Sequence, residues 1–317
     1  MTTTDSAQTS PGQATRGWYF HFGTAKGILG AAAAGQTSVR ISLDLGISKE
    51  EWEIREGGLV LDGERGICLD LSALEPVQGV ENKIFHFDGR TLTPVEIRAD
   101  GYYKLVPTES LPTLEINGVK MHRSKDIDPG EDARAKTALV VRPGDIVLDT
   151  CGGLGYSAVF AVKAGAVRVM STEKSRAVLA IRDKNPWLWP GAFPWLDQEA
   201  AQRIRLEHKD IFQGIKDLED GCFDAIIHDP PRFTSATGDL YGRQFYTHLA
   251  RVLRPCGRLF HYTGSPKRIK NGNRFVANAG KRLTKAGFAH VEFNDFLQGL
   301  VAEKAGDKDK KRVRKRP

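Results

Sequence analysis

Hydrophobic and polar residues follow one pattern in the first part of the chain and another in the rest. From Gly17 to about Arg123 apolar residues alternate with polar ones in short runs, as in VRISLDL at 39–45. This alternation is typical of strands that bury one face. Residue pairs that favour tight hairpin turns separate the runs, at Gly57-Gly58, Asp88-Gly89 and Asn117-Gly118. The pattern predicts a small, mostly-β domain over residues 17–124.

A helix is predicted where this pattern ends. Asp128 is a candidate N-cap, Pro129 suits the first helical position, and Glu131 completes a spacing like that of a capping box. We expect the helix to run from Pro129 to about Val141.

Beyond Pro143 and Gly144, short apolar runs alternate with helical segments. The apolar character of these runs is continuous, which indicates strands buried on both faces. Strands separated by helices form a mainly parallel sheet, and right-handed crossovers cover both of its faces, so a doubly wound α/β fold is expected. The predicted strands are 146–150, 167–173, 203–208, 224–229 and 258–263, with two more around Asn294-Asp295, and the helices begin near Gly155, Lys174, Ile211, Asp239 and Asn273.

The composition agrees with a folded protein of about two domains. The chain has 317 residues, of which 40% are hydrophobic and 27% charged. No apolar run approaches the ~18 residues of a membrane helix, and the first residues lack the apolar stretch of a secretory signal. The four cysteines are far apart and form no CxxC pair, so we expect no disulfide framework, no metal site and a cytoplasmic location. They are Cys68, Cys151, Cys222 and Cys256.

Most of the positive charge lies in the last residues. The net charge is +7, and residues 303–317 contain eight Lys/Arg and three acids, or +5, which leaves +2 for the rest. Such a segment repels itself, so 303–317 is predicted to be a basic disordered tail, and the Thr/Ser/Gln-rich residues 1–16 a disordered N-terminus. The tail can attract a phosphate polyanion such as RNA without reading its sequence. The alternative is a solubilising extension.

A glycine turn after the first strand of the α/β part is the strongest functional signal. It lies in VLDTCGGLGYSA at 147–158, between a strand and a helix start. Its glycines allow a sharp turn and leave room for a ligand against the backbone. The next strand ends in Glu173, where a carboxylate can accept hydrogen bonds from ribose hydroxyls, and Asp210 follows the third strand. This order favours a nucleoside-type cofactor, whereas a glycine turn alone could serve packing.

The motifs resemble those of the class I S-adenosylmethionine-dependent methyltransferases, and in particular an uncharacterised group of predicted methyltransferases best represented in archaea. The shared features are MHRSKDIDPGEDAR, VLDTCGGLGYSA, NPW near Asn185, IIHDPPRF and RLFHYTG, and they span about Lys120 to Leu300. The resemblance implies a Rossmann-like, seven-stranded methyltransferase sheet over residues 125–302. It also implies S-adenosyl-L-methionine as the cofactor.

The resemblance assigns cofactor contacts along the strand ends. The backbone around Asp149 to Gly155 would hold the methionine moiety, Glu173 the ribose and Asp210 the adenine end. The full predicted set is Asp149, Cys151, Gly152, Gly153, Gly155, Tyr156, Glu173, Lys174, Asp210, Ile211 and His228.

A proline-rich loop follows the fourth strand, in His228-Asp229-Pro230-Pro231-Arg232-Phe233. The prolines stiffen the loop and leave its carbonyls free to accept hydrogen bonds, so Asp229, Pro230 and Pro231 are the predicted catalytic residues. The loop resembles the [DNS]PP[aromatic] signature of amino-methyltransferases. Arg232 replaces the aromatic residue, so Phe233 is a candidate to stack on the substrate and Arg232 to hold a phosphate or carboxylate.

Other residues have two interpretations each. His122 and Arg123 either close over the cofactor or form a surface pair. The prolines and tryptophans at Trp187, Trp189 and Trp195 favour a packed loop over a platform for stacking bases. His261 is a core or a functional residue, and the helical spacing of Tyr241, Phe245 and Tyr246 favours the core.

Three functions remain open. The first is a methyltransferase that acts on an amino nitrogen, with RNA as the favoured substrate. The second is an aminopropyltransferase of the polyamine type, which shares the fold and uses decarboxylated S-adenosylmethionine. The third is a non-catalytic RNA-binding protein on the same fold. The sequence does not indicate an oligomeric state.

Overall fold

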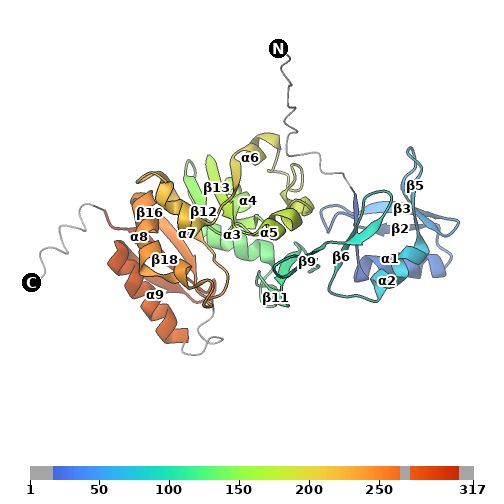
Figure 1. Cartoon of the computed structure of the whole chain (residues 1–317). Coiled ribbons are helices and arrows are strands. Elements are labelled where there is room, and N and C mark those ends of the chain that lie inside the picture. Colours follow the sequence, from blue (N-terminus) through green and yellow to red (C-terminus); the bar gives the residue numbers. More distant parts are fainter. Residues whose placement is uncertain (1–16, 265–271, 307–317) are drawn as a thin grey trace, which may run out of the picture.

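The computed structural model describes residues 17–264 and 272–306 (Figure 1). Residues 1–16 and most of the predicted basic tail lie outside the described residues. A strand-rich N-terminal region stands on one side, and the larger α/β region, which holds the glycine turn, on the other (Figure 1).

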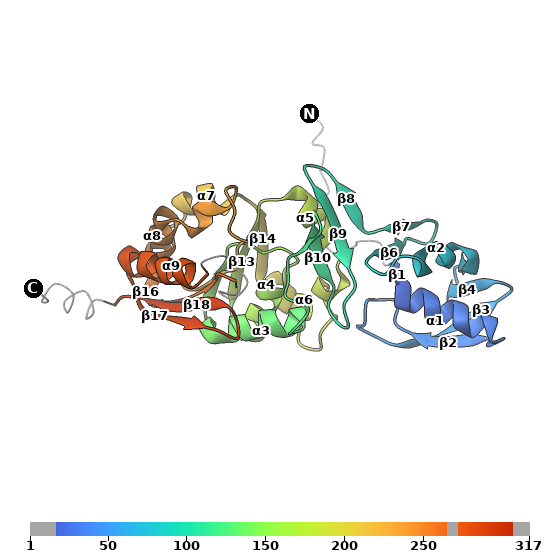
Figure 2. The same cartoon turned by 90° about the horizontal axis from the view of Figure 1, so that it is seen from below.

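The N-terminal region consists of three small antiparallel sheets and one longer helix. Their strand orders are β1-β6-β7, β2-β3-β4-β5 and β11-β10-β9-β8. The third sheet lies between the other N-terminal elements and α5 of the α/β region (Figure 2). The bounds are β1 Trp18–His21, α1 Phe22–Ala33, β2 Ser38–Ile41, β3 Glu50–Arg55, β4 Gly58–Asp62, β5 Ile67–Asp70, α2 Glu75–Gln78, β6 Ile84–Phe87, β7 Leu92–Pro94, β8 Glu96–Arg98, β9 Tyr102–Val106, β10 Thr113–Ile116 and β11 Val119–Lys120.

Helix α1 was not predicted within this mostly-β region. His21 caps it by accepting a hydrogen bond from the Gly23 amide, and a capping box with Thr24 completes the helix start. The alanine-rich sequence has high helix propensity. Ala25 and Ile28 bury one face of the helix against the sheets.

Two further local predictions need correction. The strand expected at 39–45 ends at Ile41, because Ser42 and Asp44 fold the following residues into a loop by bonding each other and nearby amides. The first hairpin turns at Glu56 and Gly57, which both have positive φ, one residue earlier than predicted. The Asn117-Gly118 turn is confirmed, with φ of 49° and 81°.

The α/β region contains a seven-stranded sheet in the order β14-β13-β12-β15-β16-β18-β17. The five strands from β14 to β16 in this order are parallel to one another, and β18 is antiparallel to both of its neighbours, β16 and β17. The predicted mainly parallel α/β sheet is confirmed. The bounds are α3 Pro129–Val140, β12 Ile146–Asp149, α4 Tyr156–Lys163, β13 Arg168–Glu173, α5 Arg176–Arg182, α6 Gln198–Gln202, β14 Ile204–His208, α7 Ile211–Gly214, β15 Phe223–His228, α8 Arg243–Val252, β16 Leu253–Tyr262, α9 Gly272–Ala286, β17 Phe288–Asn294 and β18 Gly299–Lys304. Short 3₁₀ turns η2 to η4 lie in this region at 186–188, 215–217 and 238–241, and η1 lies in the N-terminal region at 71–74.

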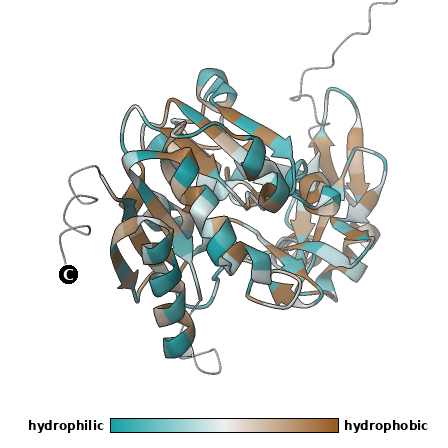
Figure 3. Cartoon of the chain, turned by 60° about the vertical axis from the view of Figure 1, so that its left-hand side comes forward, coloured by the Kyte–Doolittle hydropathy of each residue, from teal (hydrophilic) through white to brown (hydrophobic). Residues whose placement is uncertain are grey.

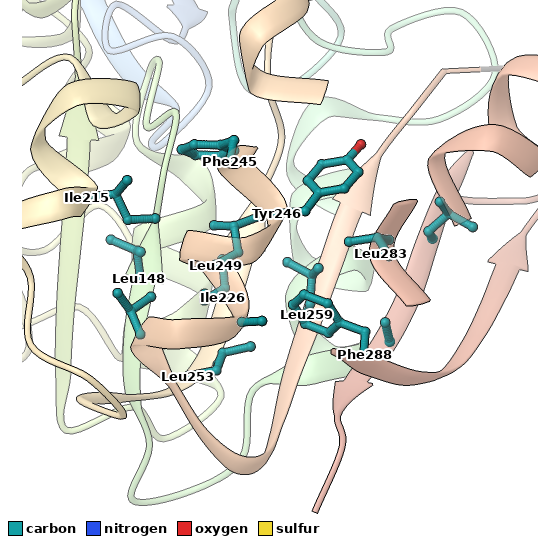
Figure 4. Packing of buried hydrophobic residues seen from close by; sticks show 14 of the residues in the cluster. Leu148, Ile215, Ile226, Phe245, Tyr246, Leu249, Leu253, Leu259, Leu283 and Phe288 are labelled. Atoms are coloured by element: carbon teal, nitrogen blue, oxygen red, sulfur yellow. The ribbon is translucent and has the colours of Figure 1, made fainter. Parts of the chain in front are cut away.

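Helices cover both faces of this sheet. Leu148 and Ile226 point to one face and pack against Phe245 and Leu249 of α8 (Figure 4). Their strand neighbours, such as Val147, point to the other face and pack against α4. Successive side chains of a strand alternate between faces, so a strand buried on both sides is apolar throughout. Figure 3 shows this contrast, with largely brown strands inside and teal residues on the outer helices.

The helix and tail boundaries differ slightly from the predictions. Asp128 caps α3 through the amides of Gly130 and Glu131, as expected. The Glu131 side chain bonds Arg134 and forms no capping box. The predicted tail begins inside β18, where Glu303 pairs with Arg258 on β16, so the strand extends to Lys304.

No helix of the described ranges is long and apolar enough to span a membrane. The four cysteines are all free, and the described part of the chain contains no cluster of metal-ligating side chains.

Candidate functional site

The glycine turn lies at the carboxyl end of β12, beside β15. Strand order changes direction between these two strands, and ligands of open α/β sheets bind at such a point. The glycines have different roles. A Cβ at Gly152 would collide with the Ser171 hydroxyl, and one at Gly155 would lie 2.6 Å from the Arg182 guanidinium carbon, whereas one at Gly153 meets nothing within 4 Å. Gly152 and Gly155 therefore allow close packing below the turn, and Gly153 faces open space.

Glu173 contacts this turn directly. Its Oε2 accepts a hydrogen bond of 3.1 Å from the Gly153 amide, and its Oε1 accepts one of 2.8 Å from the Ser175 amide. The structure thus brings together the predicted ribose acceptor and one of the glycines of the predicted cofactor turn. Both belong to the ends of adjacent parallel strands.

Asp149 is fully buried beneath the turn. Its Oδ2 accepts a 2.9 Å hydrogen bond from the Ser171 hydroxyl, while Oδ1 has no partner among the described residues. Burial raises the pKa of Asp149 to about 7, although Ser171 and the Arg182 guanidinium oppose the rise. Arg182 is also buried, and sequence patterns did not identify it.

The residues predicted at the adenine end lie beyond Glu173. The Lys174 ammonium pairs with Asp210 at 2.8 Å on the surface, and Asp210 also caps α7 through the Phe212 amide. Ile211 is buried in the core of the sheet. Asp210 and Lys174 can therefore present side chains to a ligand, whereas Ile211 can contribute its backbone.

The proline-rich loop leaves β15 on the other side of β12. The Pro231 carbonyl accepts a 2.8 Å hydrogen bond from the Tyr241 hydroxyl, which fixes the loop. Pro230 is buried, while Arg232 and Phe233 are exposed, and the Phe233 ring lies 5.5 Å from the Tyr241 ring. The loop thus presents one cation and one aromatic ring to solvent.

Asp229 is part of an ion-pair network that the sequence analysis missed. Its Oδ2 lies 2.7 Å from Lys136 Nζ, and Lys136 Nζ lies 2.6 Å from Asp132. Arg123 pairs with Asp132 at 3.0 Å and donates a 2.7 Å hydrogen bond to the Phe296 carbonyl in the β17–β18 turn. A signal existed, because Asp132 and Lys136 fall on the same side of the predicted helix as Ala133 and the core.

The pair between Lys136 and Asp229 combines burial with opposite charge. Burial acts to lower the pKa of Lys136, but the carboxylates of Asp229 and Asp132 outweigh it and raise that pKa to about 12. Burial raises the pKa of the Asp229 carboxyl above its ordinary value, and the Lys136 ammonium opposes the rise. The Asp229 side chain keeps 27% exposure, so solvent or a ligand can reach it.

His228 is fully buried, and both ring nitrogens have protein partners. Nε2 lies 3.0 Å from the Leu240 carbonyl, which can only accept, so Nε2 carries the proton and Nδ1 accepts from the Thr150 hydroxyl at 2.7 Å. Burial lowers the pKa of His228 to about 4. This geometry gives the His228 side chain a structural role, and the predicted cofactor contact of this residue stays a prediction. The stacked His261, 4.6 Å away, is buried too.

Several aromatic residues pack in the core. Tyr156 is 2% exposed, and its hydroxyl donates to the Pro112 carbonyl at 2.7 Å, so its side chain packs in the core, and its predicted cofactor contact stays a prediction. The Trp187 indole donates to the Leu45 carbonyl at 3.0 Å and joins the α/β region to the N-terminal region. The tryptophan loop is therefore packed rather than an open platform. Tyr241, Phe245 and Tyr246 are core residues.

A groove of about 550 Å³ lies elsewhere, between α9 and β17. Its lining includes Val276, Gly280 and Phe293, together with Lys281 and Asp295. None of the predicted site residues borders it.

Comparison with known proteins identifies one curated relative. A scan against models of known families finds no match. The chain is 37% identical over 280 residues to "Uncharacterized protein MJ1233" of Methanocaldococcus jannaschii, a match that covers 85% of this chain and 91% of that protein. The chain belongs to the same family as this archaeal protein.

Solved structures share the fold. Spermidine synthase from Thermotoga maritima matches with a TM-score of 0.51 and 18% identity, over 73% of this chain and 80% of that one. A spermidine synthase in complex with the transition state analogue AdoDATO gives the same values. A candidate S-adenosylmethionine-dependent methyltransferase from Listeria monocytogenes matches 55% of this chain and 96% of its own with a TM-score of 0.39 and 14% identity. The likeness to the two spermidine synthase structures shows that this chain shares their fold.

Proposed function

We propose that this protein is an S-adenosylmethionine-dependent methyltransferase that methylates an amino nitrogen, with RNA as the favoured substrate class. One observation carries the proposal. The open Gly153, the acceptor Glu173 and the carboxylate Asp229 lie at the same edge of three adjacent strands, β13, β12 and β15.

The residues of the turn fit the cofactor. The space over Gly153 would admit a ligand against the backbone, and the positive φ of 49° there is one that glycine adopts without strain. Glu173 would hold the ribose, and Asp210 and Lys174 the adenine end. When bound, S-adenosylmethionine supplies an electrophilic methyl group on a sulfonium, whose carbon–sulfur electron pair returns to sulfur as a nucleophile takes the methyl group.

The proline-rich loop would orient the nucleophile. Asp229 can accept a hydrogen bond from an amino N–H, and the fixed loop holds that acceptor in place because Tyr241 binds the Pro231 carbonyl. Orientation of the reacting groups supplies a large part of the rate in such a transfer. Burial raises the pKa of Tyr241, so its hydroxyl stays protonated and keeps this contact.

The preference for RNA depends on two features. Arg232 and Phe233 are exposed beside Asp229, and such a pair can contact a phosphate and stack on a base. The basic residues after Lys304 add attraction for a polyanion. A protein amide is the competing substrate that the same loop could take.

An aminopropyltransferase is the second candidate, because the spermidine synthase fold covers 73% of the chain. A polycationic amine needs a site with net negative charge. Here Arg123, Asp132, Lys136 and Asp229 sum to zero, and Arg232 adds a cation. The charge balance therefore favours methyl transfer. Incubation with putrescine and decarboxylated S-adenosylmethionine tests this alternative, and product formation there would replace the methyltransferase proposal.

The direct test compares modified nucleosides in total RNA from cells with and without the gene, by mass spectrometry. We expect one methylated nucleoside to disappear from the cells that lack the gene. An unchanged nucleoside profile would indicate that the substrate is a protein or a small molecule and not RNA. Calorimetry that detects no binding of S-adenosylmethionine would instead favour a non-catalytic RNA-binding protein.

A further inference from the structure

Lys136 is the group that touches the Asp229 carboxylate. We propose that Lys136 is the positioning residue of the transfer site, which holds Asp229 ionised through Oδ2 and leaves Oδ1 to accept an N–H from a neutral amino nitrogen. The inference rests on the proposed function and names its substrate class, a neutral nitrogen rather than an ammonium.

The surroundings of Lys136 fix its ammonium in one place. The residue is 4% exposed and comes from α3, while Asp229 comes from the end of β15. Nζ contacts Asp229 at 2.7 Å and Asp132 at 2.6 Å, and it lies 4.4 Å from the centre of the Tyr262 ring. An ammonium has three donors, and two carboxylates and a ring face use them in this site.

The rest of the network holds Asp132 in turn. Arg123 pairs with Asp132, so charges of alternating sign run from the segment before α3 to Asp229 at the end of β15. Arg123 also donates to the Phe296 carbonyl, which ties this set to the β17–β18 turn. Removal of one member of a buried set leaves an uncompensated charge. The set therefore fixes the charge of Asp229 as well as its position.

This arrangement leaves Oδ1 of Asp229 available to a substrate. No described residue forms a hydrogen bond to Oδ1, and the side chain is 27% exposed. A neutral amino group keeps its lone pair for attack while it donates an N–H to Oδ1. An ammonium has no lone pair and would approach the like charge of Lys136. As the new nitrogen–carbon bond forms and the carbon–sulfur bond breaks, the nitrogen becomes cationic, and its proton leaves to water rather than to Asp229.

The inference predicts a pH dependence in a variant. In Lys136→Met, burial raises the pKa of Asp229 with no ammonium nearby to oppose it. The carboxyl is then protonated below its new pKa, so activity rises with pH, whereas the wild-type rate stays flat over the same range. The titratable or charged groups that face Asp229 are Lys136 and Asp132 on α3, Arg123 before it, Asp149 on β12, Tyr262 on β16, Tyr241 on η4 and Cys151 in the glycine turn.

The experiment follows the Asp229 carboxyl by ¹³C NMR in full-length protein labelled with ¹³C-aspartate, with the signal assigned by its loss in Asp229→Asn. In the wild type we expect the signal to show an ionised carboxylate throughout the neutral pH range. In Lys136→Met the carboxyl should titrate within that range, and in Lys136→Arg it should again stay ionised. The exposed Lys49→Met is the matched control. A wild-type carboxyl that titrates near neutral pH, or an unchanged titration in Lys136→Met, would overturn the inference.

Methyl transfer from labelled S-adenosylmethionine to RNA from cells that lack the gene gives the second measurement. We expect the methyl-transfer rate of Lys136→Met to fall about tenfold or more at neutral pH. A fall of this size corresponds to an Asp229 pKa that lies one unit above the assay pH. We also expect no further loss when it is added to Asp229→Asn, because the two residues act as one unit. An equal loss at every pH would indicate packing alone. If wild-type protein transfers no methyl group, the proposed function fails, while the NMR titration still decides the role of Lys136.

Discussion

Glu173 and Asp229 both lie at the carboxyl ends of parallel strands, but their oxygens contact different kinds of partner. Glu173 accepts hydrogen bonds from two backbone amides, those of Gly153 and Ser175. Asp229 is paired with the ammonium of Lys136, 93 residues away in the chain. A carboxylate held by amides keeps its charge available for a ligand's hydroxyls. A carboxylate paired with a cation stays ionised, but the cation compensates its charge, so it selects a neutral partner.

This difference predicts that mutations can affect cofactor binding and methyl transfer separately. The glycine-turn end, with Glu173, should control cofactor affinity. The loop end, with Asp229, should control the transfer rate. Substitutions at each end should therefore change one measurement and spare the other.

Asp229→Ala is expected to have the largest effect. Loss of the orienting acceptor should reduce methyl transfer about 100-fold or more, because misplacement of reacting groups has effects of that size. The dissociation constant for S-adenosylmethionine should stay nearly unchanged. Rates with labelled cofactor and calorimetry measure the two quantities, with the exposed Asp217→Ala as control. Retained transfer in Asp229→Ala would refute the role of the loop.

Glu173→Ala tests the other end. A hydrogen bond to a charged acceptor contributes about 1.5–3 kcal/mol, so the dissociation constant for S-adenosylmethionine should rise about 10- to 100-fold. The rate at saturating cofactor should change little. Calorimetric titration checks the first statement, with Glu219→Ala as a surface control. Unaltered affinity would mean that the cofactor lies elsewhere.

Gly152 and Gly153 should also have separate roles, the first in stability and the second in cofactor binding. Gly152→Ala forces a Cβ onto the Ser171 hydroxyl and should lower the free energy of unfolding by about 1–3 kcal/mol. Gly153→Ala meets no atom and should cost only about 1 kcal/mol, for its positive φ, while it weakens cofactor binding. Urea denaturation of both variants measures the difference. Equal destabilisation with equal binding would remove the distinction between the two glycines.

His228 beneath the loop should give a smaller effect that depends on pH. Its folded pKa of about 4 lies below the unfolded value of about 6.5. Between these values the unfolded chain binds a proton that the folded protein does not, so stability falls as pH decreases from about 6.5 to 4. The slope is about 1.4 kcal/mol per pH unit for this residue. In urea denaturation, His228→Asn should reduce the pH dependence of stability by this amount, and the exposed His208→Asn should retain it in full.

The sequence predicted the proximity of Glu173 and the glycine turn better than the partners of Asp229, for a physical reason. The Gly153 turn and Glu173 are placed by local chain geometry and by pairing of adjacent strands, which leave regular patterns. The partners of Asp229 come from α3, far away in sequence, and only tertiary packing brings Lys136 to it. Helix α1 was missed because its alanines and glycines give no strong amphipathic pattern, and the His21 cap is an unusual one.

A crystal structure of the protein with S-adenosylhomocysteine tests the central claim most directly. We predict that the ribose lies on Glu173, that the backbone at Gly153 contacts the ligand, and that the sulfur faces Asp229. A ligand bound instead in the groove between α9 and β17, or an Asp229 side chain turned away from the sulfur, would contradict the account.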